Sequence, residues 1–290
     1  MKIQLGSLCP LNLDFTLCCG QAFRWEKQGD WWKGVVREKA CRIRQKGQTL
    51  EFEGANESVI ENYFRLDDDL PNIFSEIKKD RNIEAAIDEF TGLRILRQEP
   101  WECLISYICA TYKSIPAIKR MLLNLSGRLG EATYQEGNDF YTFPKPVKLA
   151  RASVQELAAC GLGYRARYVS ETAKLICGGA FDLECLKRIP YSKAKEKLMN
   201  LPGVGPKVAD CVLLFSLEKL EAFPVDVWVK RAVLKHYEGH FPDEFVRRIS
   251  ATESLSSPEY EKLSAFGREY FGKYAGYAQE YVYHYERMQL

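Results

Sequence analysis

The stretch LPGVGPKVADCVLLF, residues 201–215, joins a glycine-rich turn to an apolar run and places a lysine between them. The preceding segment YSKAKEKLMN, residues 191–200, has the apolar spacing of a short helix that ends at this turn. Pro206 suits the first turn of a second helix, because its missing N–H is not needed there. We therefore predict a helix–hairpin–helix over residues 191–219.

The glycines of this turn, Gly203 and Gly205, let the backbone come close to another surface. The free N–H groups at the start of the second helix then point outward, and such a site suits a phosphate. An ordinary αα-hairpin inside a helical bundle would explain the same glycines, so the turn alone leaves both interpretations open.

Lys207 favours the first interpretation. A cation in the first turn of a helix lies at the positive end of the helix dipole, where an acidic residue would be more stable. The same field, together with apolar neighbours, favours the neutral amine, and a neutral amine is a nucleophile. Cys211 follows one turn later and is expected on the same face of the helix.

A single aspartate opens the helical run in FPVDVWVKR, residues 223–231. Asp226 stands at the N-cap position, where its side chain would accept hydrogen bonds from the first free N–H groups. A carboxylate near a nucleophilic amine can also stabilise a developing sugar cation. The two roles are compatible.

Composition sets broad limits on the protein. The chain has 290 residues, of which 46% are hydrophobic and 28% charged, which is ordinary for a globular protein of two domains or one large one. Its net charge of +2 argues neither for nor against nucleic acid, since a local patch is sufficient for binding. No apolar run approaches the roughly 18 residues of a membrane span, and the N-terminus lacks a secretory pattern. We expect a cytoplasmic or nucleoid protein in a prokaryote and a nuclear one in a eukaryote.

The ten cysteines give no metal signature. None forms a CxxC pair, which argues against a zinc ribbon. None follows Cys211, which excludes a C-terminal iron–sulfur cluster loop. Most stand among apolar residues, as free thiols do in a reducing compartment. We expect no cofactor to be required for catalysis.

The hydrophobic pattern divides the chain in two. Short alternating segments between residues 22 and 53 predict strands, with a hairpin turn at KGQ, residues 46–48. After about residue 55 the apolar spacing changes to intervals of three and four, which predicts helices. The fold class is therefore α+β: a small antiparallel β domain with flanking helices (1–85) and a large all-α domain (86–290).

At this point the motifs resemble a known family. LPGVGPKVADC followed by PVDV is similar to the helix–hairpin–helix signature of base-excision DNA glycosylases, in which the lysine marks the bifunctional branch. Further stretches narrow the resemblance to the 8-oxoguanine DNA glycosylases, in the same order from about residue 10 to 285. These are CGQAFRW (19–25), LRILRQEPWECLISYIC (93–109), GLGYRARYV (161–169) and YAGYAQEYVYH (274–284).

The resemblance implies a reaction. Lys207 would attack C1′ of a flipped nucleotide and form a Schiff base, and Asp226 would support the oxocarbenium-like transition state. β-Elimination would then nick the strand. The partner would be duplex DNA that contains 8-oxoguanine, and the protein is expected to be a monomer without a membrane partner.

The resemblance also implies residues that recognise the base. The carbonyl of Gly20 would accept the N7–H that 8-oxoguanine has and guanine lacks. Gln279 would hydrogen-bond the Watson–Crick edge. Cys211 would cover one face of the base, and Tyr283, where the family has phenylalanine, the other.

Contacts with the rest of the duplex follow in the same way. Tyr164 would wedge into the stack beside the lesion, and Arg165 would reach the opposite cytosine. The main-chain carbonyls of Met199, Leu201 and Val204 would hold a structural monovalent or divalent cation that bridges to a DNA phosphate.

Three positions depart from the family pattern. Tyr112 replaces an asparagine, Ala117 stands where an arginine is expected, and Trp228 replaces a histidine two residues after the catalytic aspartate. We expect base excision to survive these changes, and the preference for the opposite base to be relaxed.

Other functions remain open on the residues alone. An alkylated-base glycosylase on the same fold needs the aspartate but has no use for Lys207. A non-catalytic DNA-binding module would keep the hairpin and need neither residue. A structural helical protein leaves the glycine turn unexplained.

Overall fold

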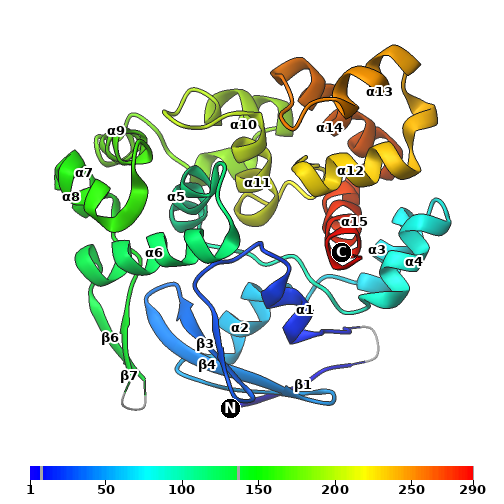
Figure 1. The fold of residues 1–290 in the computed structure, drawn as a ribbon. Coiled ribbons are helices and arrows are strands. Elements are labelled where there is room, and N and C mark those ends of the chain that lie inside the picture. Colours follow the sequence, from blue (N-terminus) through cyan, green and yellow to red (C-terminus); the bar gives the residue numbers. More distant parts are fainter. Residues whose placement is uncertain (7–8, 136–137, 290) are drawn as a thin grey trace.

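An antiparallel sheet forms the N-terminal part of the molecule (Figure 1). The computed structural model describes residues 1–6, 9–135 and 138–289. Within these residues, five strands pair in the order β1-β5-β4-β3-β2 and a separate two-stranded hairpin pairs β6 with β7. The bounds are β1 Lys2–Gln4, β2 Glu26–Gln28, β3 Trp31–Val36, β4 Lys39–Lys46, β5 Thr49–Glu53, β6 Ala132–Gln135 and β7 Asn138–Tyr141.

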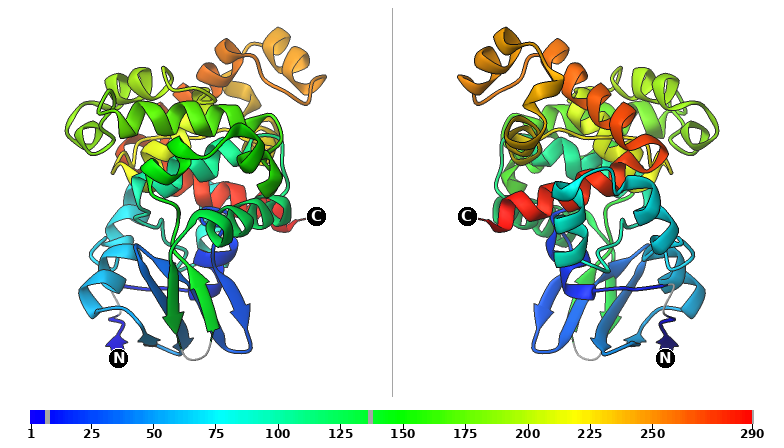
Figure 2. Two further views of the ribbon diagram at one scale, coloured as in Figure 1. Left: turned by 90° about the vertical axis from the view of Figure 1, so that its left-hand side faces the viewer. Right: turned by 90° about the vertical axis from the view of Figure 1, so that its right-hand side faces the viewer.

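Helices make up most of the remaining chain. The α-helices are α1 Leu13–Cys18, α2 Glu57–Tyr63, α3 Leu70–Ile77, α4 Arg81–Glu89, α5 Pro100–Ala110, α6 Ile115–Leu129, α7 Pro146–Arg151, α8 Val154–Leu157, α9 Arg165–Cys177, α10 Tyr191–Leu198, α11 Pro206–Ser216, α12 Val227–His236, α13 Asp243–Ser250, α14 Ser257–Phe271 and α15 Ala275–Met288. Short turns of other helix types are η1 Ala158–Leu162, η2 Glu184–Arg188, η3 Glu238–His240 and η4 Gly272–Tyr274. Figure 2 shows the helices stacked above the sheet, with α13 projecting from the far end.

The sheet has one buried and one charged face because its strands alternate. Leu50 and Phe52 of β5 are buried against α1 and α2, whereas Glu51 and Glu53 point outward. Glu51 pairs with Arg44 across the strands, which is expected for oppositely charged side chains at facing positions. The predicted strands and the turn at residues 46–48 are confirmed.

The predicted α+β class is confirmed, with two local differences. The helical part contains the β6–β7 hairpin, which packs beside β3 and β4 of the sheet. The helical spacing predicted after about residue 55 does not hold beyond Glu89, where α4 ends and the chain continues extended to α5. Gly92 has φ +93, and a Cβ there would meet the backbone nitrogen of Asn12 at 2.7 Å, so packing against the N-terminal segment overrides the helical spacing.

A large helical core continues across the predicted domain boundary. Ile73 of α3 and Ile83 of α4 belong to the same buried cluster as Leu213 of α11. The boundary between residues 85 and 86 stays a prediction. Within the described part of the chain, no helix combines the length and the apolar character that a membrane crossing requires.

The helix–hairpin–helix forms as predicted from α10, a glycine turn and α11. Gly203 has φ +80, and a Cβ at this position would lie 2.8 Å from Cβ of Tyr168 on α9. Gly205 is the N-cap of α11 with φ −93, and a Cβ there would meet nothing within 4 Å. One glycine is therefore required by conformation and packing, and the other faces open space.

The two glycines should respond differently to alanine. Gly203→Ala should lower the free energy of unfolding by about 2 kcal/mol, because a Cβ in the left-handed region is strained and Tyr168 must also move. Gly205→Ala should cost less than about 1 kcal/mol, since only a modest N-cap preference is lost. Urea unfolding of both variants measures the difference. Equal losses would contradict the conformational role of Gly203.

Candidate active site

Lys207 stands at the start of α11, at the exposed mouth of the hairpin. Gly205 caps the helix and Pro206 is its first residue, as the sequence predicts. The first turn contains no acidic residue that could neutralise the lysine. Cys211 follows one turn later and is buried, and burial raises the pKa of its thiol well above the ordinary value, so it presents a neutral sulfur. The side chain of Lys207 itself remains exposed.

Asp226 caps α12, which confirms its predicted structural role. Its Oδ1 accepts hydrogen bonds from the N–H groups of Trp228 and Val229, both at 2.9 Å. Burial raises the pKa of Asp226 above the ordinary 3.8, while the positive charge of Lys207 and the two N–H groups oppose the shift. The carboxylate thus sits in a poorly solvated place and interacts electrostatically with the amine.

A buried tyrosine hydroxyl links the helix that carries Lys207 to the segment that carries Asp226. The hydroxyl of Tyr260 on α14 donates to Oδ2 of Asp210 on α11 at 2.7 Å and accepts from the N–H of Val225 at 3.3 Å. Asp210 lies three residues after Lys207, and Val225 directly precedes Asp226. The bridge therefore ties the helix that carries the amine to the segment that carries the carboxylate.

Asp210 has further partners that satisfy its buried charge. It is 0% exposed, and Lys195 of α10 donates to Oδ2 at 2.9 Å. Tyr191 donates to Oδ1 at 2.6 Å. These contacts connect both helices of the hairpin to α14. Sequence reasoning missed this cluster, although a charged residue inside the apolar run VADCVLLF was a local signal that a buried partner exists.

Gly20 and Tyr283 lie side by side, although 263 positions apart in the chain. Gly20 has φ +98, and a Cβ there would be 3.2 Å from the hydroxyl of Tyr283 on α15. Arg287 holds this arrangement: it donates to the carbonyls of Cys18 at 2.7 Å and Cys19 at 3.2 Å, and to the Tyr283 hydroxyl at 3.1 Å. The left-handed backbone at Gly20 and the clamp by Arg287 fix the loop against α15.

The predicted base-edge residue, Gln279, lies one turn before Tyr283 on α15. Its side chain is 4% exposed, and its Oε1 has no hydrogen-bond partner among the described residues. A buried amide oxygen without a partner is uncommon in folded proteins and marks a place where a ligand can complete the hydrogen bonding.

The predicted DNA-contact residues differ in exposure. Tyr164, before α9, is 58% exposed, and Tyr112 is 85% exposed with φ +53. Arg165 is buried; it donates to the carbonyl of Thr111 and stacks on Tyr164 at 4.4 Å. Trp228 is half-buried, with the Arg231 guanidinium 4.9 Å above its ring.

The three carbonyl-bearing residues predicted to hold a cation lie in the hairpin turn. The Leu201 carbonyl accepts the N–H of Val204 at 3.1 Å, which leaves it one further lone pair. Met199 is exposed at the end of α10. Side-chain metal ligands offer no alternative, because the described residues contain no cluster of three His, Cys, Asp or Glu suited to a metal. The cation site stays a prediction.

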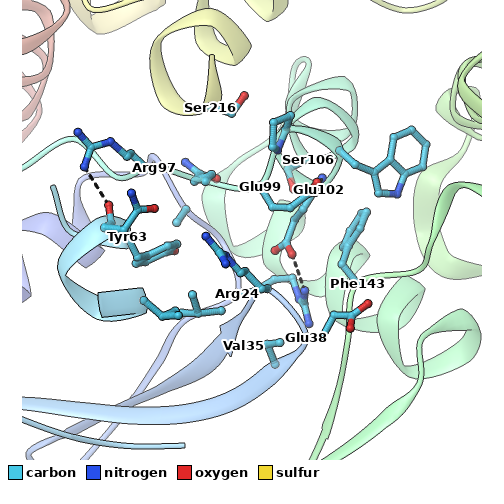
Figure 3. Close-up of a pocket in the computed structure, with 18 of the residues that line it drawn as sticks. Arg24, Val35, Glu38, Tyr63, Arg97, Glu99, Glu102, Ser106, Phe143 and Ser216 are labelled. Carbon is cyan, nitrogen blue, oxygen red and sulfur yellow. Dashed lines mark hydrogen bonds and ion pairs between the residues drawn. The ribbon is translucent and has the colours of Figure 1, made fainter. Parts of the chain in front are cut away.

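A cavity of about 840 Å³ lies away from the hairpin turn, next to the start of α5 and the end of α11. Figure 3 shows Arg24 and Glu102 paired inside it, with Phe143 beside them; the ion pair measures 2.9 Å. Ser216, the last residue of α11, lines this cavity, whereas Lys207 is near the first. The described lining includes none of the predicted site residues, so we assign the chemistry to the hairpin side.

Comparison with known proteins identifies the class. Residues 6–104 match the profile of the 8-oxoguanine DNA glycosylase N-terminal domain, and residues 105–266 match the HhH-GPD superfamily of base excision DNA repair proteins. The fold and the hairpin lysine thus define a helix–hairpin–helix base excision repair protein. Within this class, the chain belongs to the 8-oxoguanine DNA glycosylase family.

Individual relatives cover nearly the whole chain. An N-glycosylase/DNA lyase of Saccharomyces cerevisiae is 31% identical over 96% of this chain and 83% of its own length. The Arabidopsis thaliana N-glycosylase/DNA lyase OGG1 is 30% identical over 94% and 76%. The solved 8-oxoguanine glycosylase/lyase of Clostridium acetobutylicum, in complex with DNA containing cytosine opposite 8-oxoguanine, has 34% identity and a TM-score of 0.87 over 96% of this chain and 92% of that one. The resemblance seen in the motifs is confirmed at the level of the family.

Proposed function

We propose that this protein is a bifunctional DNA glycosylase that excises 8-oxoguanine through a lysine Schiff base and then nicks the strand. The observation that carries the proposal is the placement of Lys207 and Asp226 at the starts of two helices whose neighbouring residues, Asp210 and Val225, are joined by Tyr260. The amine of Lys207 attacks C1′, and the bond to the base breaks with its electron pair leaving on the base. The Asp226 carboxylate stabilises the positive charge that develops on the sugar.

The substrate base is held between the loop at Gly20 and α15. The Gly20 carbonyl accepts the N7–H of 8-oxoguanine, and normal guanine would leave that acceptor unpaired, at a cost of roughly 1–3 kcal/mol. Oε1 of Gln279, which has no partner among the described residues, accepts a hydrogen bond from the Watson–Crick edge of the base. Cys211 and Tyr283 cover the two faces. Removing the base from the helix costs a few kcal/mol, which these contacts offset.

Duplex DNA is the partner, and the exposed aromatics near the hairpin bind it. Tyr164 fills the space of the extruded base, Tyr112 and Trp228 contact the duplex, and the turn at Gly203 and Gly205 approaches a phosphate. The protein acts as a monomer in an intracellular reducing compartment and needs no cofactor, although the hairpin carbonyls can hold a structural cation. An alkylated-base glycosylase or a non-catalytic module would leave Lys207 without a purpose.

Covalent chemistry tests the proposal directly. Borohydride should trap a protein–DNA adduct on a duplex that contains 8-oxoguanine, because it reduces a Schiff base to a stable amine. Lys207→Gln should lose trapping and base release while it still binds the lesion. Lys193→Gln is the matched control, since Lys193 is an exposed lysine on the other hairpin helix. Trapping of the Lys207 variant at the wild-type level would show that another amine performs the reaction.

Asp226→Asn separates the cap from the charge. Asparagine caps a helix as well as aspartate, so excision should fall by about 100-fold or more without loss of folding. Because burial raises the pKa of Asp226, its ionised carboxylate destabilises the folded protein at neutral pH. The variant should therefore unfold at an equal or higher temperature than the wild type.

The same shift has a kinetic consequence. Protonation removes the catalytic charge, so wild-type excision should begin to fall with decreasing pH while still above 3.8, the ordinary pKa. Thermal unfolding and single-turnover excision across pH measure both effects. Near-normal excision by Asp226→Asn would reduce Asp226 to a helix cap.

Opposite-base preference should be weak. Arg165 is buried and donates to a main-chain carbonyl, Ala117 has no donor, and Lys119 donates to the Trp25 carbonyl at 3.2 Å. Tyr112 can stack on any base. We therefore expect 8-oxoguanine opposite adenine, guanine or thymine to be excised within about tenfold of the cytosine pair, since a good bidentate contact would give more.

Single-turnover excision on four duplexes that differ only in the opposite base measures this preference. A hundredfold preference for cytosine would mean that an unidentified residue reads the opposite strand. Lys113, which is exposed in the same loop, is then the first residue to replace.

A further inference from the structure

Two consecutive residues of α15 carry buried oxygens without partners. Gln279 leaves Oε1 unpaired, and Glu280, which is 3% exposed, leaves Oε2 unpaired among the described residues. The mechanism above uses Gln279 but gives no role to Glu280. An unpaired carboxyl oxygen in a protein interior is costly, so a partner that arrives with the substrate is a physical reason for it.

Glu280 lies at the place where the loop at Gly20 meets α15. Cys19 is fully buried directly before Gly20, its thiol donates to the Thr16 carbonyl at 3.3 Å, and it acts electrostatically on the Glu280 carboxyl. On its own helix, Tyr283 and Arg287 follow at three and seven residues, so they share its face. Arg287 directs its guanidinium to the loop carbonyls and to Tyr283. Oε2 of Glu280 is therefore left for another group.

Charged and titratable groups face Glu280 from each neighbouring element. Asp226 at the start of α12 acts on it electrostatically, Glu280 in turn acts on Tyr107 of α5, and Cys19 approaches from the loop. His284, the next turn of α15, has its pKa lowered to about 4 by burial and is neutral at physiological pH. Among the described residues, the charged groups that act on Glu280 are therefore the guanidinium of Arg287 and the carboxylate of Asp226.

The two carboxyl groups of the site differ in protonation for clear reasons. Burial raises the pKa of Glu280 to about 8, Cys19 and Arg287 only partly oppose this, and Asp226 adds to it. Burial also raises the pKa of Asp226, but the charge of Lys207 and two N–H donors oppose that shift. Near neutral pH Asp226 is therefore a carboxylate and Glu280 an acid with an O–H to donate.

We propose that Glu280 donates the hydrogen on its Oε2 to the C6 carbonyl oxygen of the flipped oxopurine. This inference rests on the proposed function. There, the Gly20 carbonyl binds N7–H and Gln279 binds the Watson–Crick edge, and the C6 carbonyl of a purine lies between these two positions. Glu280 lies near both residues, because it interacts with Cys19, which directly precedes Gly20, and because it directly follows Gln279 in the chain.

Such a hydrogen bond would act on rate and on selectivity. The base leaves with the electron pair of the broken bond, and a donor at its carbonyl stabilises that negative charge. No proton needs to be transferred for this effect. A 6-amino purine such as 8-oxoadenine presents a donor instead of an acceptor there, so the same group rejects it. Glu280 is thus a specificity-determining residue for 6-oxo purines.

The experiment compares single-turnover excision of 8-oxoguanine and 8-oxoadenine, both opposite cytosine, between pH 6 and about 9. Glu280→Ala should lose about tenfold on 8-oxoguanine at neutral pH and little on 8-oxoadenine. Wild-type excision of 8-oxoguanine should decline as pH rises through about 8, where the donor ionises. Glu280→Gln keeps an N–H donor at every pH, so it should retain activity and lose the decline.

His284→Phe is the matched control. His284 is buried on the same helix with an unpaired nitrogen, and its ring packs on Phe90 with centroids 4.4 Å apart. This variant should keep both the wild-type substrate ratio and the wild-type pH profile. The inference would be overturned if both Glu280 variants kept the wild-type ratio of 8-oxoguanine to 8-oxoadenine excision and the wild-type decline of excision at alkaline pH. Trapping at Lys207 would still support the proposed function in that case. Absence of wild-type trapping and excision would instead overturn the proposed function itself.

Discussion

The hydroxyl of Tyr260 is the link on which the site depends. It donates to Asp210, three residues after the amine on α11, and accepts the N–H of Val225, directly before the carboxylate. The bond to Asp210, at 2.7 Å, involves a buried charge and is therefore stronger than the bond from Val225, which joins neutral groups at 3.3 Å. Two side chains on different helices can cooperate in a reaction only if their relative position is held, and this buried oxygen joins the two segments that carry Lys207 and Asp226.

Around that link the charges are distributed unevenly. Asp210 is neutralised by Lys195, which also pairs with Glu261 at 2.7 Å, so the hairpin carries its own counterion. Lys207 has no such partner in its first turn. The positive charge of Lys195 is thus buried where it supports the fold, whereas Lys207 remains at the surface. A lysine in the first turn lowers the stability of α11, and stability alone would favour an acidic residue there. This lower stability is what a functional position would show.

Local signals in the sequence were sufficient for the hairpin, the cap and the fold class. Proline at the first turn, glycine at a positive φ and aspartate at the N-cap act through neighbours a few residues away, so they are readable without a structure. The helical spacing failed after Glu89, because contact between Gly92 and Asn12 imposes an extended chain. The β6–β7 hairpin was also missed, since short strands packed against a distant sheet carry little periodicity of their own.

The sequence by itself determined the hairpin and the candidate residues that it carries, and the tertiary structure decided what surrounds them. Nothing near Tyr260 in the chain indicates that it meets Asp210, 50 positions away. Glu280 reads as an ordinary helix glutamate, and only the packing of α15 against the loop at Cys19 makes it a buried acid. Arg165 likewise turns inward because Thr111 offers it a carbonyl. Protonation, burial and hydrogen-bond partners depend on groups far apart in sequence, and these come together only when the chain is folded.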